Sequence, residues 1–435
     1  MEDLLRLLRL QDVNTWIVLI GTGLLGFSSG IIGSFAVLRR RALVGDAVAH
    51  AALPGICVAY LLFRDAGFPV FMLGALVSGV FGVLCVSFVR SQTRIKEDAA
   101  IGLMLSVLFG LGMVLLRRIQ NDPAGSRAGL KTFIYGKAAG MTWPDVALIA
   151  SAGVLVVIVV VALFREFQVL SFDREFAAAL GWPVFRLDVL MMFLLCVCTV
   201  AGLPAVGVVL MAALLIIPGA AARFWTDHLG WMLILAGGFG MLSCAMGTAL
   251  SANVASLPAG PTIVLVAAGV FVLSMLLAPR RGLLAEGLRR WGMRRRYAMQ
   301  NLLRAMWEAG EASGDFSTRV TLGDLLQVRS WSAGALTRHL RRAAARRWVR
   351  PEADAYRLTP AGVEEAAKTA RAHRLWEAFL LEEAAIAPEY AHRYADQIEH
   401  VLPPDVLNRL EVRLRAQGRI PDPDSTDRLK GGTPA

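Results

Sequence analysis

Long apolar runs fill most of residues 16–278 and constrain the fold more than any other feature of this 435-residue chain. A helix needs about 20 apolar residues to cross the hydrocarbon core of a bilayer. The pattern predicts an all-α polytopic membrane bundle of eight or nine transmembrane helices, the count depending on two short runs that flank Gly202-Leu203-Pro204. The expected spans are Trp16–Leu38, Leu43–Phe63, Pro69–Val89, Asp98–Leu116, Pro144–Phe164, Leu187–Ala201, Ala205–Pro218, Leu229–Leu250 and Thr262–Ala278.

Clusters of basic residues at the ends of these runs predict which side of the membrane each end faces. Lys and Arg collect in short cytoplasmic loops, so nine spans and a cytoplasmic Arg280 place the N-terminus outside. One loop disagrees, because residues 117–137 carry five basic side chains and would also lie outside. The clusters expected to be cytoplasmic are Arg39–Arg41, Arg90–Lys96, Arg165–Arg186 and Arg280–Arg296.

Charge divides the chain near residue 280. Residues 1–279 hold 18 Lys+Arg and 14 Asp+Glu, whereas the 156 residues that follow hold 27 and 20. This denser, more basic second part is typical of a soluble domain attached to a membrane bundle. All five cysteines lie in apolar runs of the first part, so neither a disulfide framework nor a thiolate zinc site is expected in the soluble part.

The segment GDAVAHAALPG places two ionisable side chains inside an expected span. Asp46 and His50 are four residues apart and share one face of a helix. An ionisable pair inside a membrane is costly and usually faces a cavity or a pathway, and a carboxylate with an imidazole suits a borderline divalent cation. Glu97 and Asp98 begin the fourth span at the same expected depth. We predict that these four residues line a transport pathway; the alternative, open above all for Glu97, is interfacial charge at a helix start.

The soluble part begins with a basic exit from the membrane and continues as three helices, two short strands and a further helix. This order predicts a winged helix-turn-helix, with helices at Tyr297–Glu311, Thr321–Val328 and Ser332–Ala345 and both strands within Trp348–Pro360. The third helix and the wing are rich in arginine, a composition that binds phosphate. Attraction to the anionic inner leaflet is the alternative. The arginines are Arg338, Arg341, Arg342, Arg346, Arg347 and Arg350.

Histidine is concentrated near the C-terminus, where three of the six histidines fall within 28 residues. Each lies at helical spacing from carboxylates, so the side chains can share a helix face. Nitrogen and oxygen ligands favour manganese, iron or zinc over metals that prefer thiolates. The pattern predicts a divalent-metal site, with a solvated polar helix face as the alternative. The candidate ligands are His373, Glu377, His392, Asp396, Glu399 and His400.

Five segments of the first part, in this order, resemble the zinc/manganese/iron permease family of ABC importers over most of residues 15–278: GDAVAHAALPG, EDAAIGLMLS, SFDREFAAALG, VGVVLMAALLIIPGAAA and SANVASLPAGPTIVL. The resemblance implies a homodimeric or heterodimeric pore, an extracytoplasmic metal-binding protein and a separate cytoplasmic ABC ATPase. It places Asp46, His50 and Asp98 near the route of the metal. Because no GxxxxGK[ST] motif occurs, the chain is not expected to be an enzyme that hydrolyses ATP. The ATPase would dock on a polar, amphipathic segment through Phe172, Asp173, Phe176 and Leu180.

Residues 297–414 resemble the iron/manganese-dependent repressor family through LTPAG, AHRLWEAFL and HRYADQIEHVL. The resemblance implies a helical metal-binding and dimerisation domain in which Asp396 stands for the carboxylate of manganese-sensing members. Asn301 and Arg304 depart from it, because they stand where the first helix of the family supplies Met or acidic ligands. The ancillary-type ligands would be His373, Glu377 and His392, and the primary-type ligands Asp396, Glu399 and His400.

Together, these features predict a permease subunit of an ABC importer in the bacterial inner membrane, with a cytoplasmic metal-sensing tail. Mn²⁺ is the favoured cation, with Zn²⁺ or Fe²⁺ as alternatives. The second hypothesis is a membrane-anchored, metal-dependent DNA-binding transcriptional regulator. The expected domains are a transmembrane permease domain (1–279), a basic linker (280–296), a winged-helix domain (297–362), a helical metal-binding and dimerisation domain (363–415) and a disordered tail (416–435).

Overall fold

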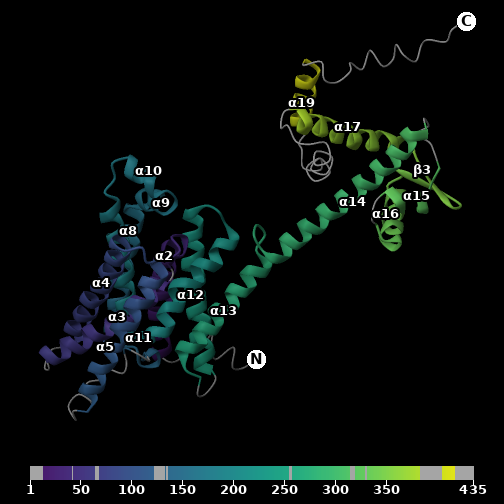
Figure 1. Ribbon diagram of the computed structural model, residues 1–435. Coiled ribbons are helices and arrows are strands. Elements are labelled where there is room, and N and C mark those ends of the chain that lie inside the picture. Colours follow the sequence, from purple (N-terminus) through teal and green to yellow (C-terminus); the bar gives the residue numbers. More distant parts are fainter. Residues whose placement is uncertain are drawn as a thin grey trace, which may run out of the picture. The chain divides into compact units, whose positions relative to one another are not determined.

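The fold is taken from a computed structural model, which describes residues 13–41, 43–63, 68–121, 133, 136–253, 257–313, 319–328, 331–382 and 404–416 (Figure 1). The chain separates into two compact units, Met1–Glu286 and Gly287–Ala435. Four of the predicted metal ligands, His392, Asp396, Glu399 and His400, lie outside the described residues, as does nearly all of the predicted tail.

The first unit is a bundle of apolar helices (Figure 1). Within the described residues, eight helices are long and apolar enough to cross a membrane, and a shorter apolar helix covers Leu210–Trp225. The count therefore falls within the predicted eight or nine. The long helices are α2 (Val13–Leu38), α3 (Leu43–Leu62), α4 (Phe68–Gln92), α5 (Glu97–Gln120), α8 (Trp143–Ala162), the first part of α11 (Val184–Trp225), α12 (Leu229–Asn253) and α13 (Ala259–Leu277).

Helix α2 lies at the centre of the bundle and packs against α11, α12 and α8. Small residues allow close approach: a Cβ at Gly26 would overlap the carbonyl group of Gly240 on α12, and one at Gly33 would overlap Leu215 on α11. Such contacts hold helices together in lipid, where apolar burial alone gives little driving force. The glycine-rich composition of the spans therefore has a direct structural reason.

Helix α11 is interrupted at Gly207, whose φ of 78° and ψ of 172° are not helical. The sequence places the break at Gly202-Leu203-Pro204, but the helix continues through Pro204 and ends three residues later. The conformation of Gly207 is one that an L-residue adopts only under strain. The break frees the carbonyl groups of Pro204 and Ala205, which accept hydrogen bonds from the backbone N–H of Lys137 at 3.2 and 3.1 Å.

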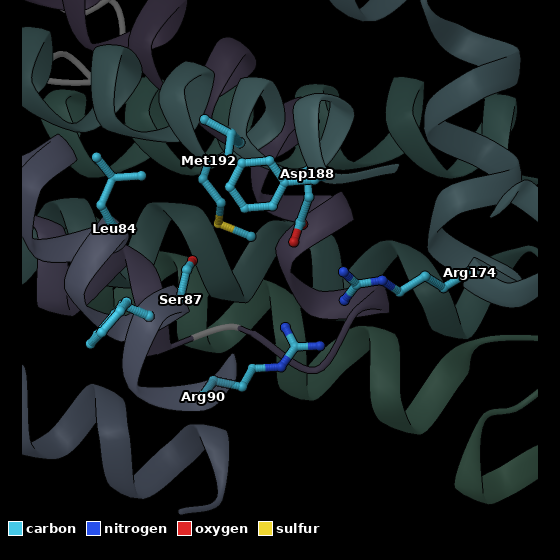
Figure 2. A pocket seen from close by; sticks show the side chains of 9 residues that line it. Leu84, Ser87, Arg90, Arg174, Asp188 and Met192 are labelled. Atoms are coloured by element: carbon cyan, nitrogen blue, oxygen red, sulfur yellow. The ribbon is translucent and has the colours of Figure 1, made fainter. Parts of the chain in front are cut away.

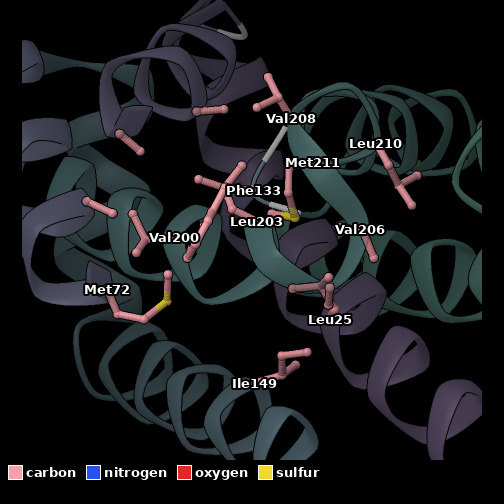
Figure 3. Packing of buried hydrophobic residues seen from close by; sticks show 14 of the residues in the cluster. Leu25, Met72, Phe133, Ile149, Val200, Leu203, Val206, Val208, Leu210 and Met211 are labelled. Carbon is pink, nitrogen blue, oxygen red and sulfur yellow. The ribbon is translucent and has the colours of Figure 1, made fainter. Parts of the chain in front are cut away.

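Apolar side chains surround this interruption and bury it (Figure 3). They come from both parts of α11, from α2, α4 and α8, and from Phe133 between α5 and α8, so the two parts of the helix share one core. The labelled members are Leu25, Met72, Phe133, Ile149, Val200, Leu203, Val206, Val208, Leu210 and Met211.

The second unit is mostly helical and contains one small antiparallel sheet with strand order β1-β3-β2. Val320 pairs with Tyr356, and Arg350 pairs with Arg357. The helices predicted at 297–311, 321–328 and 332–345 and both predicted strands are present, and the additional strand β1 precedes the second helix; the predicted helix of residues 392–400 lies outside the described residues. The elements are α14 (Leu283–Ser313), β1 (Val320–Thr321), α15 (Leu322–Val328), α16 (Ala333–Ala345), β2 (Val349–Glu352), β3 (Ala355–Leu358), α17 (Pro360–Glu382) and α19 (Pro404–Ala416).

Candidate functional site

Asp46 and His50 face each other on α3. The Nε2 of His50 lies 3.4 Å from Oδ1 of Asp46, and the two side chains are 32% (Asp46) and 23% (His50) exposed. The ring of His50 packs edge-on against Phe109 of α5, with 4.6 Å between ring centroids. Its Nδ1 is buried and has no hydrogen-bond partner within the described residues. The pair therefore offers a carboxylate and an imidazole at one point of an otherwise apolar helix.

Pro54 adds a backbone feature that the predicted pathway did not include. A proline lacks the N–H that would bond the carbonyl group four residues earlier, and in α3 that carbonyl belongs to His50. The oxygen is thus deprived of its usual helical donor beside the ionisable pair. The HAALP spacing in the sequence could have identified this oxygen.

Glu97 and Asp98 form the first turn of α5, which packs against α3. Within the described residues, no three His, Cys, Asp or Glu side chains come together to hold a metal ion. The structure therefore brings Asp46 and His50 together, but it does not join Asp98 to them in one ligand cluster.

The predicted docking segment forms two short helices, α9 (Phe164–Phe172) and α10 (Arg174–Ala179). Asp173 begins α10, where its carboxylate accepts a hydrogen bond from the backbone N–H of Phe176 at 2.8 Å. Three large apolar side chains of the segment are exposed: Phe172 at 63%, Phe176 at 53% and Leu180 at 51%. The segment therefore presents apolar surface in a connection between spans.

Buried contacts fix α9 and α10 to the bundle. Phe167 is fully buried, and its ring meets Phe35 of α2 with 5.7 Å between centroids. Ala177 of α10 is also fully buried. Through Phe167 the segment is therefore packed against α2.

Asp188, at the start of α11, joins several basic residues at the same end of the bundle. It pairs with Arg39 and with Arg41, whose Nη1 lies 2.8 Å from its Oδ1, and all three side chains are buried. Figure 2 shows Asp188 in a pocket with Arg90 of α4 and Arg174 of α10. The predicted site residues did not include Asp188, although a lone carboxylate at the start of an apolar run is a usable signal.

The ends of α2 and α4, the helices α9 and α10 and the start of α11 therefore lie together. In the chain, the start of α3 directly follows the basic end of α2, and the start of α5 follows the basic end of α4. Asp46 and Asp98 therefore belong to this end of the bundle as well.

Ion pairs involve residues of two other basic segments. At the close of α13, Arg280 and Arg281 pair with Asp227, at 3.7 and 2.5 Å. The region of 117–137 includes Lys137, which pairs with Asp145 at 3.2 Å.

In the second unit, His373 of α17 lies beside Arg304 of α14. The distance from Nη1 of Arg304 to Nδ1 of His373 is 2.8 Å, and Nε2 of His373 lies 3.5 Å from Glu377. Because a guanidinium only donates hydrogen bonds, Nδ1 must accept and the ring proton must sit on Nε2. Neither ring nitrogen then offers a lone pair to a metal. This arrangement does not fit a metal ion bound at His373.

The six predicted anion-binding arginines lie on α16 and on the segment that leads into and through β2, and all six are exposed. Arg346 lies over the ring of Trp348, 5.0 Å from its centroid. His339, on the same helix, has a pKa that is lowered from the usual 6.5 by burial and then by the charges of Arg342 and Arg338. This surface concentrates positive charge on one helix and an adjoining strand.

A bundle with eight helices long and apolar enough to cross a membrane, within the described residues, is the fold of a polytopic membrane protein. Comparison with known families agrees: residues 12–278 match the ABC 3 transport family. This chain belongs to that family, and it is a transport subunit rather than an enzyme. Residues 359–424 match the model of the iron dependent repressor, metal binding and dimerisation domain.

Individual proteins resemble the chain over different lengths. It is 39% identical over 417 residues, 95% of each chain, to the manganese transport system membrane protein MntC of Bacillus subtilis. It is 41% identical over 290 residues, 67% of this chain and 97% of the other, to the zinc transport system membrane protein TroC of Treponema pallidum. The solved structure of PsaBC from Streptococcus pneumoniae in complex with Fab is similar with a TM-score of 0.56 and 29% identity, covering 64% of this chain and 97% of that one.

Proposed function

We propose that this chain forms the membrane pathway of an ABC importer for a divalent transition metal ion, with Mn²⁺ favoured and Zn²⁺ or Fe²⁺ as alternatives. The observation that carries the proposal is the contact between Asp46 and His50, 3.4 Å apart in an apolar helix. A carboxylate and an imidazole suit these cations. The names of the manganese and zinc transport proteins that resemble the chain support the same substrate class.

Further ligands are needed along this pathway, because two side chains do not replace the hydration shell of a divalent cation. Glu97 and Asp98, at the start of the neighbouring helix α5, are proposed as pathway residues. A second permease subunit, identical or related, is proposed to complete the pore. An extracytoplasmic metal-binding protein would deliver the ion.

We propose that the end of the bundle that holds Asp188 and α9–α10 faces the bacterial cytoplasm. Four basic clusters lie at this end of the bundle, and the cytoplasmic loops of membrane proteins carry an excess of Lys and Arg. The exposed Phe172, Phe176 and Leu180 would then contact a cytoplasmic ABC ATPase, with Asp173 shaping the turn between the two helices. The second unit would be cytoplasmic as well.

Metal accumulation by cells tests the transport proposal. Asp46→Ala and His50→Ala should each reduce ATPase-dependent Mn²⁺ content to the level of cells without the chain, while the amount of folded protein in the membrane stays unchanged. His228→Ala is the matched control, because His228 belongs to the same unit but is exposed outside the helices. Normal accumulation by both pathway variants would remove the pair from the route of the metal.

We propose that residues 297–362 form a winged helix-turn-helix and residues 363–415 a metal-binding and dimerisation domain that senses cytoplasmic metal. The order β1-α15-α16-β2-β3 supports the winged fold. The remaining predicted ligands, His392, Asp396, Glu399 and His400, would form the sensing site. Metal bound there would stiffen the domain, since ligands that repel one another are relieved by a shared cation.

A second function, DNA binding by a membrane-anchored regulator, is favoured by the arginines of α16 and β2. Arg341 on α16 and Arg350 on β2 are both exposed and could contact a phosphate backbone. Retention of duplex DNA by the purified chain at low salt, with a steep loss as salt rises, would support it. Binding to anionic vesicles without binding to DNA would assign the same surface to the membrane.

A further inference from the structure

Arg304 is the largest of the fully buried side chains among the described residues, with 2% of its surface exposed. A buried guanidinium keeps its charge and must be paired or hydrogen-bonded. Arg304 reaches the ring of His373, 69 positions later, from Nη1, and the carboxylate of Glu308, 2.6 Å from Nε. The pairing joins α14 to α17 across the core of the second unit.

The pairing also decides what His373 can bind. Its Nδ1 lone pair accepts from Arg304, so the proton of the neutral ring lies on Nε2, toward Glu377. A metal ion binds imidazole through an unprotonated nitrogen. A cation at His373 would therefore have to displace the guanidinium first.

Charge opposes that displacement. Arg304 is permanently positive, and a divalent cation held by His373 and Glu377 would lie beside it in a site that water screens weakly. His373 is 4% exposed and Arg304 2%, so the two cations would be held close together with little access to solvent. The site already holds one cation, the guanidinium of Arg304, which is covalently part of the chain.

We propose that Arg304 is a built-in cation that takes the place of a metal ion at the His373–Glu377 pair. Helices α14 and α17 are then joined at this point at any metal concentration, and His373 is not a metal ligand. This role of Arg304 does not depend on which ion the membrane part transports. If His373 binds no metal, any metal sensing by this domain must use ligands other than His373.

Metal stoichiometry of the purified full chain tests the proposal. The chain and its variants are equilibrated with Mn²⁺ or Co²⁺ and dialysed, and bound metal per chain is measured by mass spectrometry. His373→Ala should leave the stoichiometry unchanged, because His373 holds no metal. Loss of one metal ion per chain in His373→Ala would overturn the proposal.

Removal of the guanidinium supplies the complementary test. Arg304→Met should gain up to one metal ion per chain, and the double variant Arg304→Met with His373→Ala should lose that gain. Arg304→Lys keeps a cation and should gain none, while Arg296→Met removes an exposed arginine of the same helix as a control. A folded Arg304→Met chain that gains no metal would contradict the built-in cation. If Arg304→Met does not fold, the metal stoichiometry of His373→Ala still tests whether His373 holds a metal ion.

Discussion

Asp188 is a buried carboxylate shared by two buried arginines, Arg39 and Arg41. Asp188→Asn would remove the negative charge that the two guanidinium groups share, and breaking a buried pair costs about 3–5 kcal/mol. We expect a clear fall in the thermal unfolding midpoint of the detergent-solubilised chain.

Asp227→Asn is the matched control for that prediction. Its partners Arg280 and Arg281 are half-exposed, and exposed ion pairs contribute about 0–1 kcal/mol. The midpoint should therefore change little. Equal losses in the two variants would show that burial of Asp188 does not set its contribution.

His339 makes the stability of the second unit depend on pH. Burial and the nearby charges of Arg342 and Arg338 lower its pKa below 6.5, so the unfolded chain takes up a proton at a higher pH than the folded chain does. Stability is therefore lost as the pH falls below about 6.5. Amide hydrogen exchange of α16, corrected for intrinsic rates, should show weaker protection at pH 5.5 than at pH 7.5.

Replacement of the imidazole isolates its contribution to this pH dependence. His339→Gln should flatten the change in protection between the two pH values, whereas His228→Gln, at an exposed position, should leave it unchanged. The same change in protection in His339→Gln as in the natural chain would assign the pH effect to another group.

Residue spacing predicted some contacts of the candidate sites and missed others for a physical reason. The four-residue spacing of Asp46 and His50 was sufficient to place them together, because helical periodicity is local. The ring contact with Phe109 and the contact of Arg304 with His373 depend on how separate helices pack. Local periodicity carries no information about that packing, so Arg304 could be identified only as a departure from a family pattern.

The interruption of α11 shows the same limit for an element. Pro204 suggested a break, but the helix continues past it and is interrupted three residues later at Gly207, where the backbone N–H of Lys137 bonds the carbonyl groups of Pro204 and Ala205. Gly207→Ala should cost about 1–3 kcal/mol, because a Cβ at φ 78° is strained. A lower unfolding midpoint would confirm this.

A glycine within a regular helix supplies the control for that substitution. Gly269 of α13 has open space around the position of a Cβ, so Gly269→Ala should be neutral or stabilising by up to about 1 kcal/mol. An unfolding midpoint for Gly207→Ala as high as that of the natural chain would mean that the backbone at residue 207 carries no strain.

The helices α9 and α10 are predicted to contact the ATPase. A photo-reactive phenylalanine analogue at position 176 should crosslink to the ATPase subunit in the assembled transporter, because Phe176 is exposed in this segment. The same analogue at Val161, an exposed position of the spanning helix α8, should not. Crosslinks from Val161 but not from Phe176 would contradict both the contact and the proposed orientation.

Composition was enough to predict the division of the chain into two parts. Apolar runs and sparse charge mark the bundle, and the structure separates a second unit close to the predicted membrane exit, at Gly287. Span boundaries were predicted less well around α11, where length and hydropathy cannot locate a buried turn. Motifs in a fixed order indicated the family, which the match over residues 12–278 then established.

The central proposal is that Asp46 and His50 lie on a route for divalent metal through this chain. Its most direct test is uptake of Mn²⁺ into proteoliposomes that contain the chain together with its ATPase and metal-delivery partners. We predict ATP-dependent uptake that Asp46→Ala and His50→Ala abolish and His228→Ala preserves. ATP-dependent uptake at the natural rate in both pathway variants would contradict the proposal.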